Sequence, residues 1–502
     1  MTVANLPVRD DDDRVPIHVV EGIDGGEQVD TSRGPRVGWF DRIRLKYLAQ
    51  ATAALLIAVT GTVLYFLPVA DPATETAIRG GAALLVFMGL WLVRATPDHL
   101  AAILFFGTIP ALGLAPPEIV FSGFRAGALW LILAGFIIGG TIDATGLGAR
   151  LANVMVVMWG RSYPAMVTGA VLVGAILVFI APSAIARVFM LVPIFNSLSD
   201  RVGFERGSNG RSGLVLAAAL GTLIPSYAVL PSTAPNLVML GTAERIFGVN
   251  IGYNEYLIIN FPVLAGLTII CLPILICHML PAEARASAGL SEKSKITRNE
   301  RTLFCILIMA LAFWVTDFVH GISPAWIALF AAALCLAPGF GPGRKVPLAD
   351  SVNLGLWLFI AAVIGAGAMV SYTGFGDYSG KWLVEVAQLT PGNKMRNFYA
   401  IVLIGMIVAV PATMLGAPAI LTPLAYNLSI ATGFPLETIL MLQVPTWMFF
   451  VMPYQLPAIL AVMALGGIRF GQCIRVLTMF TAFGVFVILP LQFLWLVTLG
   501  YI

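Results

Sequence analysis

Charged side chains are scarce in this sequence. Only 11% of the 502 residues are Asp, Glu, Lys or Arg, whereas hydrophobic residues make up 59%. Soluble domains carry roughly 25% charged residues, so a water-soluble protein of this length would lack the polar surface to cover itself. The mean hydropathy of +0.91 agrees with this. The composition therefore excludes most soluble enzymes and indicates a polytopic membrane protein.

Residues that carry metal or nucleophilic chemistry are also few. The five cysteines form no close C-x-x-C pair, and the four histidines form no H-E-x-x-H spacing. A P-loop and a G-x-S-x-G nucleophile motif are missing as well. We therefore expect no catalytic residues, no metal and no cofactor apart from a coupling ion. The net charge of +3 is too small to favour nucleic acid as a partner.

The N-terminal residues 1–45 differ from the rest of the chain. They contain the acidic run Asp10–Asp13 and few long apolar stretches, which predicts a disordered cytoplasmic tail. A basic cluster precedes the first apolar run and, by the positive-inside rule, places the N-terminus in the cytoplasm. The cluster consists of Arg33, Arg36, Arg42, Arg44 and Lys46. The C-terminus would then lie outside a plasma (inner) membrane.

Long apolar runs dominate the remainder. A spanning helix needs about 20 mostly apolar residues. The candidate spans are 47–68, 77–94, 99–115, 126–144, 213–245, 254–280, 302–320, 323–339, 353–374, 437–467 and 476–500. The sequence thus predicts an all-α polytopic membrane protein with about eleven transmembrane helices.

Two further apolar segments, 163–198 and 399–430, are interrupted in the middle. The interruptions are Ala181-Pro182-Ser183 and Pro411-Ala412-Thr413. Because proline breaks a helix interior, we interpret each segment as a re-entrant hairpin whose half-helices enter and leave on the same side. This interpretation also gathers the basic loops in the cytoplasm, as the positive-inside rule requires.

Two of the long spans are broken as well, 213–245 by Pro231 to Asn236 and 437–467 by Pro453 to Pro457. The order span, hairpin, broken span, span therefore occurs twice. Five spans separate equivalent elements, so the second copy would be inverted, and inverted repeats with discontinuous helices are typical of secondary transporters. The predicted domains are scaffold helices 46–125, a first repeat 126–280, second scaffold helices 302–352 and a second repeat 353–500.

Polar residues at the four breaks are the candidate site. Half-helix N-termini carry unsatisfied N–H groups and attract anions. Arg187 lies one turn past Ser183 in an apolar half-helix, where it would serve as an anion ligand, a fixed positive charge or a snorkelling bystander. The remaining candidates line the site or only cap the broken ends: Ser183, Thr233, Asn236, Thr413, Tyr454 and Gln455. Gln443 is either interhelical glue or site lining.

At these residues the sequence resembles the divalent anion/sodium symporter family of the ion transporter superfamily. The resemblance runs from about Ser122 to the C-terminus. Its segments include Phe121-Ser122-Gly123-Phe124, Thr145-Gly146-Leu147-Gly148, Pro182 to Arg187 and Thr233 to Leu237. Pro182 to Arg187 is similar to the P-S-N-T-A-R hairpin tip of the 2-oxoglutarate/malate translocator branch.

The resemblance implies a homodimer with a fixed scaffold and a mobile transport domain that moves like an elevator within the lipid bilayer. It implies small anionic substrates, namely di- or tricarboxylates, sulfate or sulfonate, and sodium coupling in most members. Alternatives are an anion exchanger or a proton-coupled carrier without sodium. An anion channel or a polytopic membrane enzyme is the alternative of another class.

The sequence departs from the family at both hairpin tips. Ala184 stands at the tip asparagine, and the second tip reads Thr413-Met414-Leu415. In the family those asparagines help to bind sodium. If Na⁺ couples transport here, its ligands would come from the tip residues Ser183, Ala184, Thr413 and Met414. We therefore expect weak or absent sodium dependence.

Overall fold

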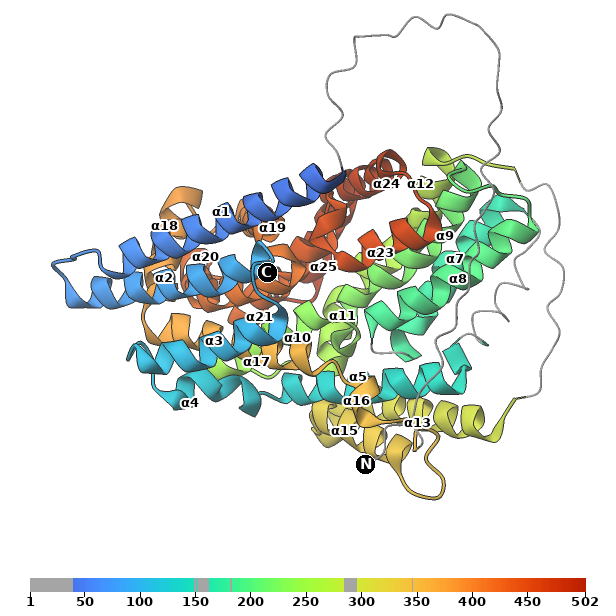
Figure 1. Cartoon of the computed structure of the whole chain (residues 1–502), viewed down its shortest axis with the longest axis horizontal. Helices are drawn as coiled ribbons and strands as arrows, with labels where there is room; N and C mark the ends of the chain where they lie inside the picture. Colours follow the sequence, from blue (N-terminus) through green and yellow to red (C-terminus); the bar gives the residue numbers. More distant parts are fainter. Residues whose placement is uncertain (1–38, 149, 151–161, 181–182, 284–295, 345) are drawn as a thin grey trace, which may run out of the picture. The chain divides into compact units, whose positions relative to one another are not determined.

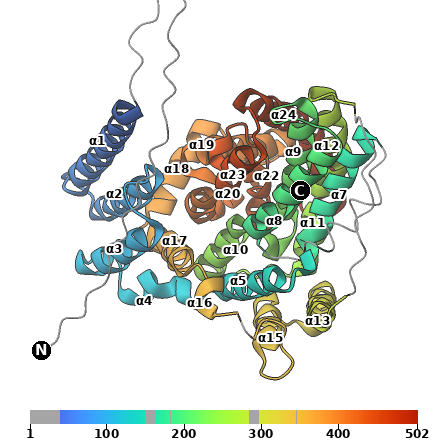
Figure 2. The ribbon, with the colours of Figure 1, turned by 45° about the vertical axis from the view of Figure 1, so that its right-hand side comes forward.

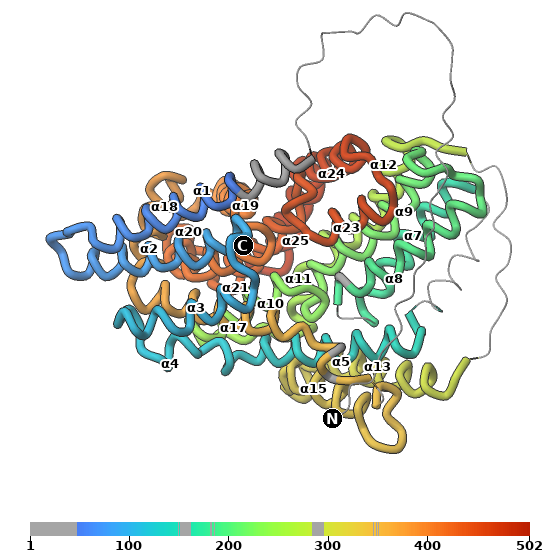
Figure 3. Tube along the Cα trace, in the orientation of Figure 1, coloured from blue at the N-terminus to red at the C-terminus, as the bar shows by residue number. Residues whose placement is uncertain are grey.

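The computed structural model describes residues 39–148, 150, 162–180, 183–283, 296–344 and 346–502. Residues 50–502 form one compact unit, to which the description below applies (Figures 1 and 3). Every regular element of the described residues is a helix, which confirms the all-α fold. The predicted tail falls almost wholly outside the described residues.

Eight helical segments of the described chain are long and apolar enough to cross a membrane. Each broken span is divided into pieces too short to count among them. The integral membrane assignment is therefore supported, while the number of eleven spans stays a prediction. The eight segments are 48–65, 72–92, 127–145, 163–180, 253–279, 354–372, 394–432 and 470–498.

Of the helices before the first repeat, α1 is the least buried, with 6% of its apolar window inside the protein. Gly61 of α1 packs so closely on α2 that a Cβ there would collide with Val86. Asp71 begins α2 by accepting a hydrogen bond from the Thr74 amide at 2.9 Å. The elements are α1 (Trp39–Tyr65), α2 (Pro72–Leu92), α3 (Asp98–Ala111), α4 (Pro117–Val120) and η1 (Phe121–Arg125).

The first repeat contains the predicted order of elements. Its first helix ends at Gly146, whose φ of 73° suits the left-handed conformation that closes a helix. The elements are α5 (Gly127–Thr145), α7 (Tyr163–Ile180), α8 (Ala184–Arg201), α9 (Asn209–Leu223), η2 (Pro225–Ala228), η3 (Leu230–Ser232), α10 (Ala234–Phe247), α11 (Tyr253–Asn260), η4 (Phe261–Ala265) and α12 (Gly266–Met279).

Within the described residues, four helices connect the two repeats. Thr297 and Glu300 form a reciprocal capping box that fixes where the first of them begins. The Glu300 carboxylate also accepts from Arg150 Nε at 2.8 Å and so ties this helix to the first repeat. They are α13 (Arg298–Val315), α14 (Asp317–His320), α15 (Pro324–Leu336) and α16 (Leu348–Ser351).

The second repeat follows the same order as the described elements of the first repeat. The amphipathic helix α18, which lies outside every apolar span expected from the sequence, precedes the hairpin. The elements are α17 (Leu354–Tyr372), α18 (Phe375–Ala387), α19 (Lys394–Leu421), η5 (Thr422–Leu424), α20 (Ala425–Thr432), α21 (Leu436–Met441), α22 (Val444–Met448), η6 (Pro453–Gln455), α23 (Pro457–Gly466), α24 (Phe470–Phe483), η7 (Gly484–Ile488) and α25 (Leu489–Thr498).

Both predicted hairpins fold back on themselves. The rings of Tyr163 and Phe204, at the two ends of the α7–α8 pair, lie 5.7 Å apart. In the second hairpin a Cβ on Gly405 would lie 3.3 Å from Leu421 Cδ1. A straight helix would separate two residues so spaced by about 24 Å. The reversal occurs at Thr413, whose φ of 58° and ψ of 179° are not helical. Ala181 and Pro182 of the first turn lie outside the described residues.

The last span of each repeat contains a π-helical turn, η4 in one and η7 in the other. From the sequence alone, both spans are expected to be uniform helices. The turn at η7 begins at Gly484, where an added Cβ would collide with the Phe449 ring. The two turns begin 223 residues apart, close to the spacing of 222 between Ser232 and Tyr454. This correspondence supports the internal repeat.

The second half of each broken span packs against the hairpin of the other repeat. Within each repeat, the first half of the broken span packs on its own hairpin, α9 on α7 and α8, and α22 on α19. The second half packs on the hairpin of the other repeat, α10 on α19 and α23 on α8. Figures 1 and 2 both show α7, α8 and α9 side by side. The breaks and the hairpin turns are thereby brought into one region.

Candidate functional site

Arg187 is a buried cation beside the first broken span. Its side chain is 1% exposed, so snorkelling to a membrane surface does not describe it. Nε donates to Thr222 Oγ1 at 2.7 Å. Nη2 lies 3.5 Å from the Thr222 carbonyl oxygen and 3.4 Å from that of Ser232. The guanidinium therefore connects the end of α9 to η3 across the break.

The first hairpin turn presents a hydroxyl that also caps a helix. Ser183 Oγ accepts from the Ala186 amide at 3.3 Å and begins α8. Ser183 is half-buried beside α5, where a Cβ on Gly139 would lie 3.6 Å from its Cβ. Ala184 follows as the first helical residue and is also half-buried. The capping function is thus confirmed, and a role in substrate or ion binding stays a prediction.

Thr233 and Asn236 lie at the start of α10 and differ in what they bond. The Thr233 side chain makes no capping hydrogen bond and is half-buried. Asn236 is fully buried, and its amide nitrogen lies 3.0 Å from the Tyr227 carbonyl oxygen and 3.3 Å from that of Val229. Asn236 therefore holds the unwound backbone in shape.

The second hairpin turn is strained rather than charged. Thr413 is a β-branched residue at positive φ, a conformation that such residues rarely adopt. Its side chain is half-buried, while the neighbouring Met414 is 2% exposed. Met414 is therefore packed inside the protein.

Tyr454 and Gln455 attach the second break to the second hairpin. Tyr454 Oη donates to the Val410 carbonyl at 3.4 Å, and Gln455 Nε2 donates to the Ala409 carbonyl at 3.4 Å. Tyr454 is 47% exposed and Gln455 is 3% exposed. Both predicted residues thus contact the helical turn that directly precedes Thr413 in the chain.

The first repeat contains the equivalent attachment. Ser232 Oγ donates to the Val178 carbonyl at 2.8 Å. A polar side chain of each break therefore bonds a carbonyl in the last helical turn before the hairpin reversal. Such carbonyls have lost their helical partners and need a donor. The parallel again supports the repeat.

Four residues that matter here were not among the predicted site residues. Thr222 and Ser232 accept from Arg187. Thr422 Oγ1 lies 3.1 Å from Gln443 Oε1, which joins the second hairpin to α22 and makes Gln443 interhelical glue. Trp447 Nε1 donates to Asn236 Oδ1 at 3.3 Å and directly links the two repeats. In the sequence, these residues could have been recognised as side chains with hydrogen-bonding groups that lie inside an apolar segment next to a break.

The structure therefore gathers the predicted residues into two clusters. One contains Ser183, Arg187, Thr233 and Asn236, and the other contains Thr413, Met414, Tyr454 and Gln455. The pair of Asn236 and Trp447 joins them, and Asn196 Nδ2 of α8 donates to the Leu465 carbonyl of α23 at 3.0 Å. A single binding site between the two turns stays a prediction.

The family model for the sodium:sulfate symporter transmembrane region matches residues 48–502. The chain belongs to this family. It is a transporter and not an enzyme, and it is an integral membrane protein.

Similar proteins agree with this membership. The chain is 25% identical over 426 residues to the inner membrane protein YbhI of Escherichia coli, covering 76% of this chain and 86% of that one. It is 26% identical over 311 residues to the putative malate transporter YflS of Bacillus subtilis, covering 58% and 64%. The YdaH transporter of Alcanivorax borkumensis has a similar fold, with a TM-score of 0.56 at 15% identity, covering 91% of this chain and 99% of that chain.

Proposed function

We propose that this transporter carries small organic dianions, di- or tricarboxylates, by secondary active transport with an elevator motion. The observation that carries the proposal is the buried guanidinium of Arg187, fixed beside the unwound segment between α9 and α10. A positive charge at a helix break favours an anionic substrate. Sulfate and sulfonate are the other candidate substrates.

The start of α10 supplies the donors for such an anion. Thr233 leaves the first turn of α10 without a side-chain cap, so N–H groups there have no intrahelical acceptor. Arg187 acts in this proposal as a fixed charge behind the break, because Nε is already engaged by Thr222. Malate is the first substrate to test, since a relative is named a putative malate transporter.

Coupling to protons or to a counter-anion is favoured over sodium. A hard cation needs about six oxygen ligands, and Ala184 and Met414 contribute no side-chain oxygen to the two turns. The positive charge of Arg187 near the first turn would repel a second cation. Among the described residues of the two turns themselves, Ser183 and Thr413 keep side-chain oxygens, and backbone carbonyls add to them.

Uptake into proteoliposomes tests the function. We expect labelled malate to enter with sodium replaced by choline at fixed pH, and to exchange against internal unlabelled malate. Vesicles without protein give the background. Uptake that falls to background in choline would contradict the coupling proposal but not carboxylate transport. Flux without counterflow would indicate a channel.

The membrane topology is tested by cysteine labelling. Glu205 is exposed in the loop after α8, which the hairpin interpretation places in the cytoplasm. Glu205→Cys, with the exposed Cys305 replaced by serine, should react with an impermeant maleimide only after the membrane is permeabilised. Labelling of intact cells would show that the first hairpin crosses the membrane and would contradict the inverted repeat.

The homodimer is tested separately by the mass of the purified protein in detergent.

A further inference from the structure

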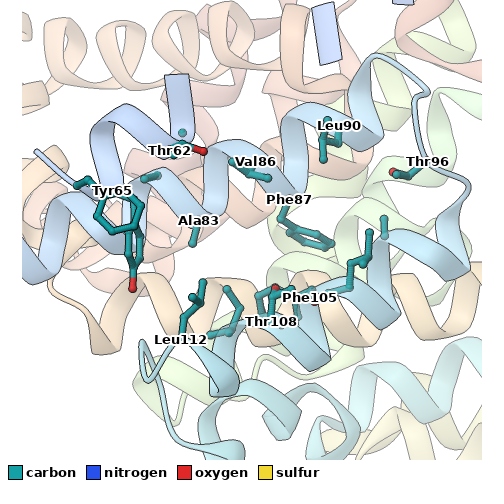
Figure 4. A pocket seen from close by; sticks show the side chains of 16 residues that line it. Thr62, Tyr65, Ala83, Val86, Phe87, Leu90, Thr96, Phe105, Thr108 and Leu112 are labelled. Carbon is teal, nitrogen blue, oxygen red and sulfur yellow. Dashed lines mark hydrogen bonds between the residues drawn. The ribbon is translucent and has the colours of Figure 1, made fainter. Parts of the chain in front are cut away.

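A cavity of about 350 Å³ lies between α1, α2 and α3 (Figure 4). The residues of the helix breaks do not line it, and the transport proposal does not use it. Its walls are apolar and include Val86, Phe87, Leu90, Phe105 and Ile109. A volume of several hundred ångströms cubed is within the range of small-molecule binding sites.

The cavity opens toward the outside of the protein. Phe66, Leu104 and Leu112 line it and are 73%, 43% and 52% exposed. The apolar window of α1, Leu48–Tyr65, is only 6% buried, as expected for a helix whose surroundings are lipid. The natural contents of an apolar cavity open to lipid are hydrocarbon chains.

Two of the three threonine hydroxyls in the walls are already used. Thr62 Oγ1 donates to the Ala58 carbonyl at 2.8 Å, and Thr108 Oγ1 donates to the Leu104 carbonyl at 2.7 Å. Thr96 is different, because its Oγ1 is buried and lacks a hydrogen-bond partner among the described residues. Figure 4 shows Thr96 beside Leu90 at one end of the cavity, and Tyr65 and Leu112 at the other. Among the threonines that line the cavity, Thr96 therefore has the hydroxyl that is still able to bind a ligand.

A strained arginine lies two residues before Thr96 in the chain. Arg94 has a φ of 56° and follows the C-cap of α2, a position that normally belongs to glycine. Its side chain is exposed. The nearby acidic residue Asp98 accepts from Trp91 Nε1 at 2.9 Å. The chain thus keeps a basic residue two positions before Thr96 at a conformational cost that glycine would avoid.

The length of the cavity fits one leaflet of a bilayer. Its lining on α3 runs from Ala101 to Leu112, which spans about 16 Å of helix. Half of the hydrocarbon core of a bilayer is about 15 Å. We propose that the cavity binds one acyl chain of a membrane phospholipid whose phosphate contacts Arg94 and the Thr96 hydroxyl.

Native mass spectrometry of the purified full-length protein tests this proposal. Phosphatidylglycerol and phosphatidylethanolamine are titrated in maltoside detergent against wild type, Ala83→Phe and Arg94→Gly. Ala83 lines the cavity and is half-buried, so phenylalanine there should fill it and remove the bound lipid. Arg94→Gly should weaken binding of both lipids about fivefold, the value of one basic residue at a membrane surface.

The controls separate lipid binding from folding. Arg94→Gly relieves strain, so its melting temperature in detergent should not fall. Gln388→Gly releases the same kind of strain at the C-cap of α18, where φ is 51°, and should leave lipid binding unchanged. Unchanged binding in both Ala83→Phe and Arg94→Gly would overturn the proposal. So would disulfide-linked dimers of Phe66→Cys in native membranes, which would show a second copy over the opening.

Discussion

The two hairpin turns differ in what stabilises them. Around the first turn, Arg187 is 1% exposed and bonds oxygens on both sides of a break. Around the second, Thr413 carries a left-handed backbone and Tyr454 is 47% exposed. The first turn thus has a fixed charge and a dense hydrogen-bond network, whereas the second has strain and an open side. An internal repeat can therefore keep its geometry while dividing charge and strain between its two halves.

The largest expected effect is at the charge of the first turn. Arg187→Ala should lower malate uptake about a hundredfold or more, since it removes a buried, hydrogen-bonded cation. Arg187→Lys keeps a point charge but loses the planar fork that reaches Thr222 and two carbonyls, so partial activity is expected. Initial uptake rates in proteoliposomes, normalised to reconstituted protein, give the comparison.

A second buried arginine provides the matched control. Arg211 on α9 is 4% exposed and pairs with Asp200 at 2.5 Å. Arg211→Ala should lower thermal stability while the folded fraction still transports. If Arg187→Ala transports like wild type, or if both variants lose transport in proportion to stability, Arg187 is a structural residue only.

The next effect concerns the link between the repeats. Asn236→Leu should lower the free energy of unfolding by about 2–3 kcal/mol, because buried carbonyls of the break lose their donor. Trp447→Phe removes one neutral hydrogen bond and should lower it by about 1 kcal/mol. Thermal melting in one detergent ranks the variants, and equal losses would show that Asn236 contributes only its bond to Trp447.

Relief of strain at the second turn should have a smaller effect of opposite sign. Thr413→Gly should raise stability by about 1 kcal/mol, because glycine adopts positive φ freely. Thr413→Val keeps the strain and removes the hydroxyl. If the hydroxyl binds substrate, the valine variant should show a raised KM while the glycine variant also changes the maximal rate. A lower melting temperature for Thr413→Gly than for wild type would contradict backbone strain at this residue.

The smallest effect is expected at the open side of the second turn. Tyr454→Phe removes a long hydrogen bond of a half-exposed side chain and should change stability by no more than about 0.5 kcal/mol. Gln455→Leu removes bonds of a buried amide to Met452 and Ala409 and should cost about 1–2 kcal/mol. Thermal melting in one detergent gives the comparison, and equal losses of stability would contradict the difference in burial between Tyr454 and Gln455.

Composition and proline spacing determined the class of the protein and the positions of its four breaks. A chain with 11% charged residues must bury its backbone polar groups in helices within a bilayer, and proline limits where those helices continue. Both hairpins and both broken spans were located in this way. The amphipathic helix α18 was missed because its 13 residues are too few for a membrane span and alternate between apolar and polar types; it packs on α2 and α20.

Only the tertiary structure decided which polar groups meet. Asn236 and Trp447 are 211 residues apart, and Arg187 finds Thr222 and Ser232 only after α8 and α9 pack together. The sequence marked Arg187 as costly in an apolar segment but did not show which oxygens receive it. The strain at Thr413 was equally hidden, because threonine is not a residue that predicts positive φ. Local signals fix where a helix can break, whereas the partners of buried polar atoms depend on packing between segments far apart in the chain.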